Sequence, residues 1–267
     1  MKRTMYTRTF TRLAAAAVAM AAPAALAEQV TVTIRNLAPT DGTFLTPMWV
    51  GFHNGGFDSL NLGAAASPGL ESLAEDGATA TISAEFTASG AGAVQGTIAS
   101  GGIPPIEPGE TTSMVFDLDP LAASSRYFSY ASMVIPSNDA FLANDDPFEH
   151  MIFDAAGNFQ SQRFFLLGSE VLDAGSEVND ELPANTAFFG QAAPNTGVTE
   201  GGTVGAHPGF FGSFGNPGGI ASILASADFA NADFTLPGYT IAEVTVTPEP
   251  GALALLAIGG LAFFRRR

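Results

Sequence analysis

Two segments at opposite ends of the chain alternate between apolar and polar residues. Residues 29–36 read QVTVTIRN, and residues 239–246 read YTIAEVTV. A period of two is typical of a half-buried β-strand, because successive side chains of a strand point to opposite faces. The pattern therefore predicts that the first and last parts of the folded region are both strands.

Short strand-like segments separated by turn residues fill much of the chain between these two. We expect strands at Thr46–Gly51, Thr79–Phe86, Thr112–Leu118, Tyr127–Ile135 and Arg163–Val171. Gly, Pro, Asn and Asp cluster between them, for instance over residues 101–108. Such spacing indicates an antiparallel β-sandwich or barrel, and so an all-β fold.

Helical signals are few. Residues 68–75 follow Ser67, a good N-cap, begin with a proline and end near Gly77, so we expect a short helix there. A second short helix is expected around Ser222–Phe229, and the glycine-rich stretch 197–219 is expected to be a long loop. No internal repeat or linker divides residues 28–247, which we treat as one domain.

The first 27 residues have the plan of a secretory signal peptide. Basic residues come first, an apolar stretch runs from Leu13 to Ala22, and residues 25–27 form a small-x-small cleavage site. We expect the mature chain to begin at Glu28. The alternative is a retained N-terminal helix, although this apolar stretch is short for a membrane span.

Residues 248–267 combine a Pro-Glu-Pro motif, an apolar run from Ala252 to Phe264 and three arginines. A helix of 13 residues covers only about 20 Å of a roughly 30 Å hydrocarbon layer, so it is a marginal span. The order of these elements resembles the PEP-CTERM sorting signal of Gram-negative bacteria. That resemblance implies transient inner-membrane anchoring, removal by an exosortase-type enzyme and delivery to the cell surface or extracellular matrix. The alternative is a plain transmembrane anchor that is never cut.

The net charge of residues 28–247, which we call the body of the protein, limits the kinds of partner that it can bind. Residues 28–247 contain three arginines, no lysine and 25 of the chain's 26 acidic residues. Such a surface repels nucleic acid and attracts cations, so we expect no nucleic-acid partner and favour a divalent metal. The chain has no cysteine, which excludes disulfides and thiolate metal sites.

Four segments together resemble the spondin domain, known from F-spondin and from many secreted bacterial proteins. They are residues 30–37 (VTVTIRNL), 60–77 (LNLGAAASPGLESLAEDG), 133–141 (MVIPSNDAF) and 171–177 (VLDAGSE). The resemblance spans roughly residues 29–247. It implies an antiparallel β-sandwich similar to calcium-and-lipid-binding domains, with Ca²⁺ held by loops at one end.

The resemblance also implies the calcium ligands, which fall on Asp139, Asp173 and Glu177. Glu177 departs from the vertebrate form, which has aspartate there. Independently of the family, Asp139 and Asp173 lie where expected strands enter loops, and Gly175 permits a bend that returns Glu177 toward Asp173. Converging carboxylates repel each other unless a cation is present. Without the family, solvated turn acids remain the simpler interpretation.

Other candidate sites are weaker. The acidic runs 144–146 and 179–181 are either a second cation site or solvated loops. The three histidines, at 53, 150 and 207, have no partner at ligand spacing, and Trp49 is either core or a sugar-stacking residue. No phosphate loop, nucleophile elbow or dinucleotide motif is present.

These observations favour an exported, non-enzymatic calcium-binding module that functions in interactions at the cell surface or in the extracellular matrix, with an extracellular polysaccharide or a surface protein as its partner. The alternative is a hydrolase of the polysaccharide matrix. Glycosidase chemistry needs two carboxylates at a defined separation, and nothing in the sequence selects such a pair.

Overall fold

In a computed structural model of this chain, residues 27–249 are described apart from 102–104, 213–214, 216–218 and 220. The expected signal peptide, except Ala27, and the apolar run 252–264 lie outside the described residues. Within the described part, no helix has the length and apolar character needed to cross a membrane.

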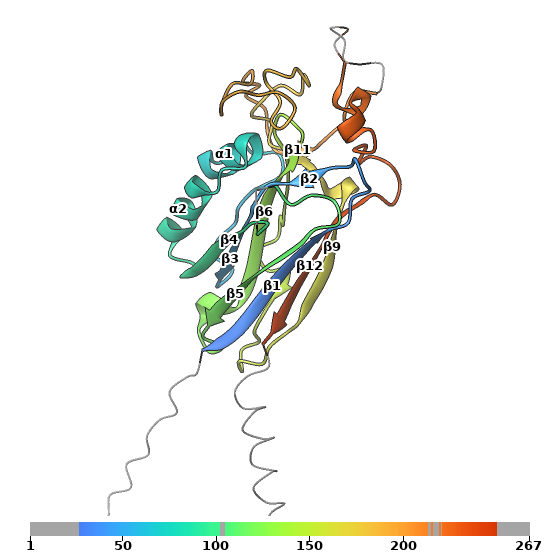
Figure 1. Cartoon of the computed structure of the whole chain (residues 1–267). Coiled ribbons are helices and arrows are strands. Elements are labelled where there is room, and N and C mark those ends of the chain that lie inside the picture. Colours follow the sequence, from blue (N-terminus) through green and yellow to red (C-terminus); the bar gives the residue numbers. More distant parts are fainter. Residues whose placement is uncertain (1–26, 102–104, 213–214, 216–218, 220, 250–267) are drawn as a thin grey trace, which may run out of the picture.

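Two antiparallel sheets form the fold. The first sheet has four strands in the order β5 (Thr111–Leu118), β1 (Glu28–Asn36), β12 (Thr240–Pro248) and β9 (Gln162–Leu167). The second has the order β11 (Gly205–Ala206), β10 (Leu172–Asp173), β7 (Ala140–Ala143), β6 (Tyr127–Ile135), β3 (Met48–His53) and β4 (Val94–Ile98). Two short strands, β2 (Phe44–Leu45) and β8 (His150–Met151), also pair with β6. The all-β sandwich predicted from the sequence is confirmed (Figure 1).

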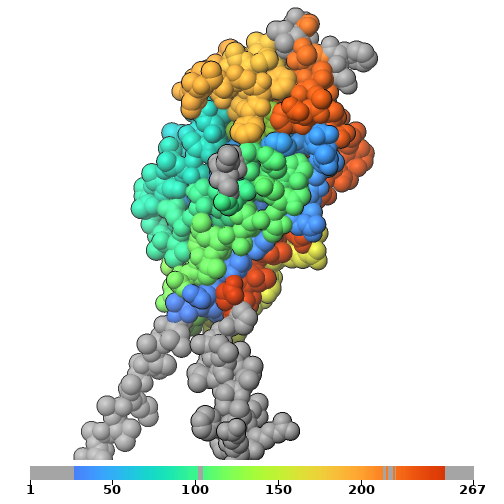
Figure 2. All heavy atoms as spheres, in the orientation of Figure 1, coloured from blue at the N-terminus to red at the C-terminus, as the bar shows by residue number. Residues whose placement is uncertain are grey.

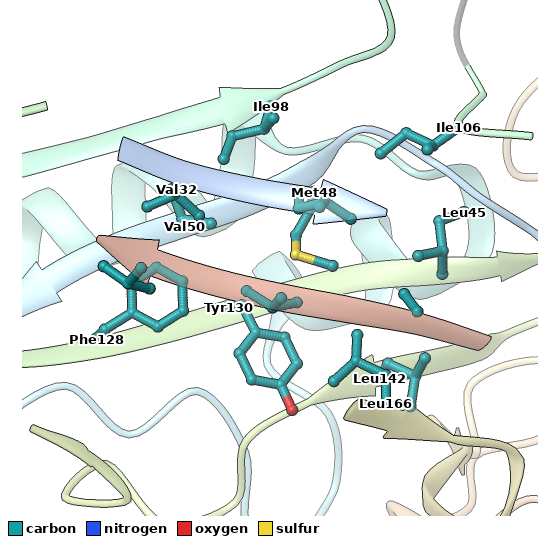
Figure 3. Packing of buried hydrophobic residues seen from close by; sticks show 14 of the residues in the cluster. Val32, Leu45, Met48, Val50, Ile98, Ile106, Phe128, Tyr130, Leu142 and Leu166 are labelled. Atoms are coloured by element: carbon teal, nitrogen blue, oxygen red, sulfur yellow. The ribbon is translucent and has the colours of Figure 1, made fainter. Parts of the chain in front are cut away.

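The main core lies between the two sheets. In β1, Val30, Val32 and Ile34 are fully buried, while the residues between them reach the surface, as their alternation predicts. They belong to one cluster with Val50 and Phe128 of the second sheet, part of which Figure 3 shows. Burying such side chains contributes about 1.5–3 kcal/mol each, so this interface accounts for much of the stability of the sandwich.

The second sheet is covered on both faces. Helices α1 (Pro68–Asp76) and α2 (Ala80–Ser89) pack on the face that points away from the first sheet (Figure 1). Trp49 of β3 is fully buried there, with its ring centroid 5.4 Å from Phe86 of α2 and 5.5 Å from Phe57. Trp49 is therefore a core residue, and a sugar-stacking role is excluded by its burial.

The expected strand at Thr79–Phe86 is wrong, because this segment is helix α2. Its threonines and isoleucine suggested a strand, since β-branched residues favour sheets. Ile82 and Phe86 stand four residues apart, however, and both are buried against the second sheet, which a helix achieves on one face. Gly90, with φ of 65°, ends the helix in the left-handed conformation.

Helix α1 confirms the expected cap at Ser67, whose Oγ accepts the backbone N–H of Leu70 at 3.1 Å. The second expected helix, at Ser222–Phe229, is instead two 3₁₀ turns, Ile223–Ala225 and Ala227–Phe229. Ser226 lies between them in an extended conformation and caps the second turn, which prevents one continuous helix.

The expected strand Arg163–Val171 is too long, because β9 ends at Leu167 and a 3₁₀ turn follows at Gly168–Glu170. A Cβ on Gly168 would lie 2.0 Å from the carbonyl oxygen of Phe234. This close approach explains both the glycine and the departure of the chain from the sheet.

The first and last strands place both chain exits at one end of the sandwich. Thr31 of β1 is paired with Thr247 of β12, so β1 begins beside the point where β12 ends. Figures 1 and 2 show this end at the bottom, whereas β11 and the segment after Asp173 form the opposite end. The loops that carry the candidate site therefore lie far from the exits.

The packing of α2 can be tested at Phe86. Because its side chain is fully buried beside Trp49 and Phe57, Phe86→Ala should lower the free energy of unfolding by about 3–5 kcal/mol, measured by urea denaturation. Thr81→Ala, on the exposed face of the same helix, is the control and should change it by less than about 0.5 kcal/mol. A small effect at Phe86 would contradict the helical placement.

Buried histidine gives a pH-dependent prediction. His150 is 5% exposed and stacks on Phe164 at a centroid distance of 3.9 Å, and burial lowers its pKa to about 4. The unfolded chain then binds more protons between pH 6.5 and pH 4, so stability falls as the pH drops through this window. His150→Phe removes this penalty, and its stability relative to the original protein should rise by roughly 2 kcal/mol between pH 7 and pH 4.5.

The measurement is urea unfolding of both proteins at several pH values. Glu149, whose carboxylate lies 3.8 Å from the imidazole Nε2, would offset part of the effect by pairing with a charged His150. Parallel pH profiles for the two proteins would refute the assignment of His150 as a buried neutral group.

Candidate functional site

The first expected ligand, Asp139, lies between strands β6 and β7. Ser137 shapes the preceding turn: its hydroxyl donates to the carbonyl of Val134 at 2.6 Å and accepts the backbone N–H of Ala140 at 3.1 Å. This turn buries Asp139 completely at the start of β7.

Asp139 binds directly to the turn that carries the other two expected ligands. Its Oδ2 accepts the backbone N–H groups of Ser176 at 2.9 Å and Glu177 at 3.0 Å, and the Ser176 hydroxyl lies at 3.3 Å. Its Oδ1 is buried without a hydrogen-bond partner. Burial raises the pKa of Asp139 to about 6, with repulsion from Asp173 adding to the effect and the backbone donors opposing it.

Asp173 ends β10 and organises the bend that follows. Its Oδ1 accepts the backbone N–H of Gly175 at 2.7 Å, and its Oδ2 accepts the side-chain amide of Asn179 at 2.6 Å. Gly175 has a φ of 65°, and a Cβ there would lie 2.5 Å from the backbone nitrogen of Thr203. The predicted tight bend at Gly175 is confirmed, and only glycine fits it without strain.

Glu177 is buried, with 2% of its surface exposed. Its carboxylate packs against Gly197, whose backbone N–H it accepts, while its Oε2 is buried without a partner. Burial raises the pKa of Glu177 to about 8, and the nearby Glu75 is the next contributor to that increase.

The structure thus brings Asp139 against the Asp173–Glu177 turn, as expected. The three acids differ, however, in their charged neighbours. Among charged groups, Asp173 raises the pKa of Asp139, whereas Glu75 of helix α1 has the largest such effect on the pKa of Glu177. Across the described ranges, no group of three acidic or histidine side chains is arranged to hold a metal ion. We call Glu75, Asp139, Asp173, Ser176 and Glu177 the acidic rim.

Glu75 is the member of the acidic rim that sequence reasoning missed. It lies in the last turn of α1, is 5% exposed and is hydrogen-bonded to the side chain of Ser176. Burial raises its pKa, and Glu71 and Asp76 add to the increase. The available signal was its position directly after Leu73 and Ala74, on the apolar side of the helix.

The other acidic runs have structural roles. Asn144 accepts the backbone N–H of Tyr130 at 3.0 Å and donates to Ser129, so it links β6 to the loop that follows β7. Glu181 is 3% exposed and accepts the backbone N–H of Ile223 at 2.9 Å, which fixes the loop beyond β11. These contacts account for Asn144 and Glu181 without a second cation.

The three histidines lie in separate places. His53 is hydrogen-bonded to Ser129 at 2.9 Å, His150 stacks on Phe164, and His207 lies 3.1 Å from Asn179. Burial lowers the pKa of each to about 4, so all three are neutral at pH 7.

Comparison with known families identifies two regions. Residues 37–146 match the Spondin_N family, and residues 246–267 match the PEP-CTERM protein-sorting motif. The first match contains helices α1 and α2 and Asp139 but ends before Asp173 and Glu177. No curated protein matches the chain.

The sorting motif begins at Val246, inside β12, and implies export, C-terminal membrane anchoring and processing by an exosortase-type system. The chain is a spondin-domain protein that carries a PEP-CTERM sorting motif.

Proposed function

We propose that this exported, surface-associated protein is a non-enzymatic module whose acidic rim binds Ca²⁺ and whose rim loops attach it to an extracellular polysaccharide or to a surface protein. Asp139, Asp173 and Glu177 would supply the carboxylates. Bound calcium would supply positive charge that these loops lack, and so fix their conformation.

The observation that carries the proposal is a pair of buried carboxylate oxygens without donors. Asp139 Oδ1 and Glu177 Oε2 both lack a hydrogen-bond partner, and the other Asp139 oxygen accepts the backbone N–H groups of Ser176 and Glu177. A buried carboxylate with one oxygen that lacks a donor is costly, and a bound proton or cation would relieve this cost. Calcium prefers hard oxygen ligands of this kind.

The charge of the body supports a cation from solution over an internal one. It contains no lysine, and the side chain of Arg163 forms an ion pair with Glu243 on the first sheet. None of the ion pairs in the described part of the chain involves an acid of the acidic rim. A divalent ion is the simplest source of compensating charge.

The position of the acidic rim supports a role in surface attachment. The sorting motif begins in the last residues of β12, at one end of the sandwich, whereas β11, which pairs with Asp173 of the acidic rim, lies toward the other end (Figure 1). While the protein is anchored through its C-terminal segment, the acidic rim would face away from the membrane.

The burial of these acids argues against the hydrolase alternative. Asp139 and Glu177 have the raised pKa values that a general acid needs, but they are 0% and 2% exposed. A catalytic carboxyl group must come within about 3 Å of the glycosidic oxygen, which a sugar chain cannot achieve at either residue in this structure.

Calcium titration of the exported protein tests the proposal. We expect saturable binding by isothermal titration calorimetry and a higher melting temperature in millimolar CaCl₂ than in chelator, since an ion that binds only the folded state stabilises it. Asp139→Asn keeps an acceptor for the turn but removes the charge, so it should weaken binding at least tenfold. Asp145→Asn, an exposed acid outside the acidic rim, should bind like the original protein.

Two outcomes of these titrations would contradict the proposed role of the acidic rim. If the original protein gives neither binding heat nor a change in melting temperature at millimolar calcium, the acidic rim is not a calcium site. Equal losses of affinity in both variants would show that bulk negative charge, and not Asp139, attracts the ion.

A further inference from the structure

The end of helix α1 has an unusual electrostatic arrangement. Glu75 and Asp76 occupy its last turn, which contains no basic residue. The C-terminal end of a helix carries a partial negative charge, so acids are unfavourable there and cations are favourable. Glu75 is also buried, which prevents water from screening this repulsion fully.

Ser176 connects Glu75 to the rest of the acidic rim. Its hydroxyl lies 3.3 Å from Asp139 Oδ2, and its side chain also forms a hydrogen bond with Glu75. A hydroxyl carries one proton and can donate it to only one carboxylate at a time. One of the two acids therefore lacks this donor at any moment.

Glu177 provides an independent sign of a missing ligand. Only 2% of its surface is exposed, and its Oε2 has no hydrogen-bond donor. Among the charged groups that raise the pKa of Glu177, Glu75 has a larger effect than Asp139. The carboxylate that carries this unpartnered oxygen is thus influenced by Glu75, and none of the ion pairs among the described residues includes it.

A solvent cleft reaches this cluster. Its walls are formed by Pro68, Glu71, Ser72, Glu75, Asp76 and Asn195, and its volume is about 200 Å³. An ion with its water shell could enter along this acidic wall and reach Glu75 without opening the sandwich.

We propose that Glu75 is a further calcium ligand of the acidic rim and that it shares the ion with Glu177. This inference rests on the proposed calcium binding, but it assigns a residue on a helix that neither the family resemblance nor the spacing of the acids identified. Glu75 and the Ser176 hydroxyl would add to the carboxylates of Asp139, Asp173 and Glu177, and water from the cleft would complete the six to eight oxygen ligands that calcium takes.

The test compares Glu75→Gln with Glu71→Gln, an exposed acid one turn earlier in α1 that lines the same cleft. Calcium affinity is measured by calorimetry, and the melting temperature is measured in chelator and in saturating CaCl₂. Glu75→Gln should bind calcium at least tenfold more weakly and yet melt at or above the original temperature in chelator, because a repulsive charge has been removed. Glu71→Gln should stay within twofold in affinity.

Each remaining outcome decides the question. Unchanged affinity in Glu75→Gln would overturn the role of Glu75 while leaving calcium binding by the acidic rim intact. A Glu75→Gln protein that is destabilised equally with and without calcium would show a purely structural residue. Glu75→Asp keeps the charge and should recover part of the affinity, and no binding by the original protein would refute the proposed function itself.

A second inference comes from the other end of the molecule. The first two residues of the Pro-Glu-Pro motif belong to the paired sheet, since Pro248 is opposite Val30 and the backbone N–H of Glu249 donates to Gln29 at 2.8 Å. The Thr31 hydroxyl also donates to the Glu249 carboxylate. The strand β1 therefore covers part of the sorting signal.

We infer that the processing enzyme acts only after the end of β12 has separated from β1. An enzyme that binds a peptide through its backbone needs the N–H and C=O groups that β1 now occupies, and local opening of a strand end supplies them. The Thr31–Glu249 hydrogen bond opposes this opening.

Thr31→Val removes this hydrogen bond with little change in shape, and Thr33→Val changes a neighbouring outward-facing threonine that is opposite Thr245. In the exporting bacterium, pulse-chase labelling should show tag removal about threefold to fivefold faster for Thr31→Val, which corresponds to about 1 kcal/mol for one hydrogen bond. Thr33→Val should match the original rate. Equal rates for all three proteins would show that β1 does not restrain processing.

Discussion

The antiparallel pairing of β1 with β12 fixes the organisation of this protein. It joins the first and last strands of the body, so both chain exits lie at one end of the sandwich, and the inward-facing valines of both strands form one side of the core. Because the sorting motif continues directly from β12, the same pairing determines how the domain is presented while it is anchored. The loops that carry the acidic rim are consequently held at the far end.

The acidic rim is held together by hydrogen bonds that satisfy only part of its charge. Asp139 uses one oxygen to bind the backbone of the Ser176–Glu177 turn, which attaches β7 to the loop after β10. Its other oxygen, and one oxygen of Glu177, are buried without hydrogen-bond donors. A domain with an apolar core can tolerate a few such groups, and their presence together in the acidic rim is the reason why we propose that it binds a cation.

Much of the fold followed from sequence periodicity, and its failures have clear causes. The strands at residues 29–36 and 112–118 were predictable because one face of the first sheet meets solvent. The segment after Thr79 was misread because the second sheet is buried on both faces, and a helix that covers it needs few polar residues. The ends of β9 and of the expected helix at 222–229 depend on contacts with Phe234 and on the Ser226 cap, which no local pattern reveals.

The candidate site was partly predictable. The turn at Gly175 and the proximity of Asp139 followed from glycine and acid positions, whereas the burial of Glu177 beneath Gly197 and the approach of Glu75 depend on the packing of distant segments. The most direct measurement is a crystal structure of the protein grown in calcium, with anomalous scattering used to locate the ion. A calcium peak within about 2.3–2.6 Å of carboxylate oxygens of the acidic rim is the predicted result. A well-ordered acidic rim with no such peak, and with Asp139 Oδ1 and Glu177 Oε2 still lacking partners, would contradict it.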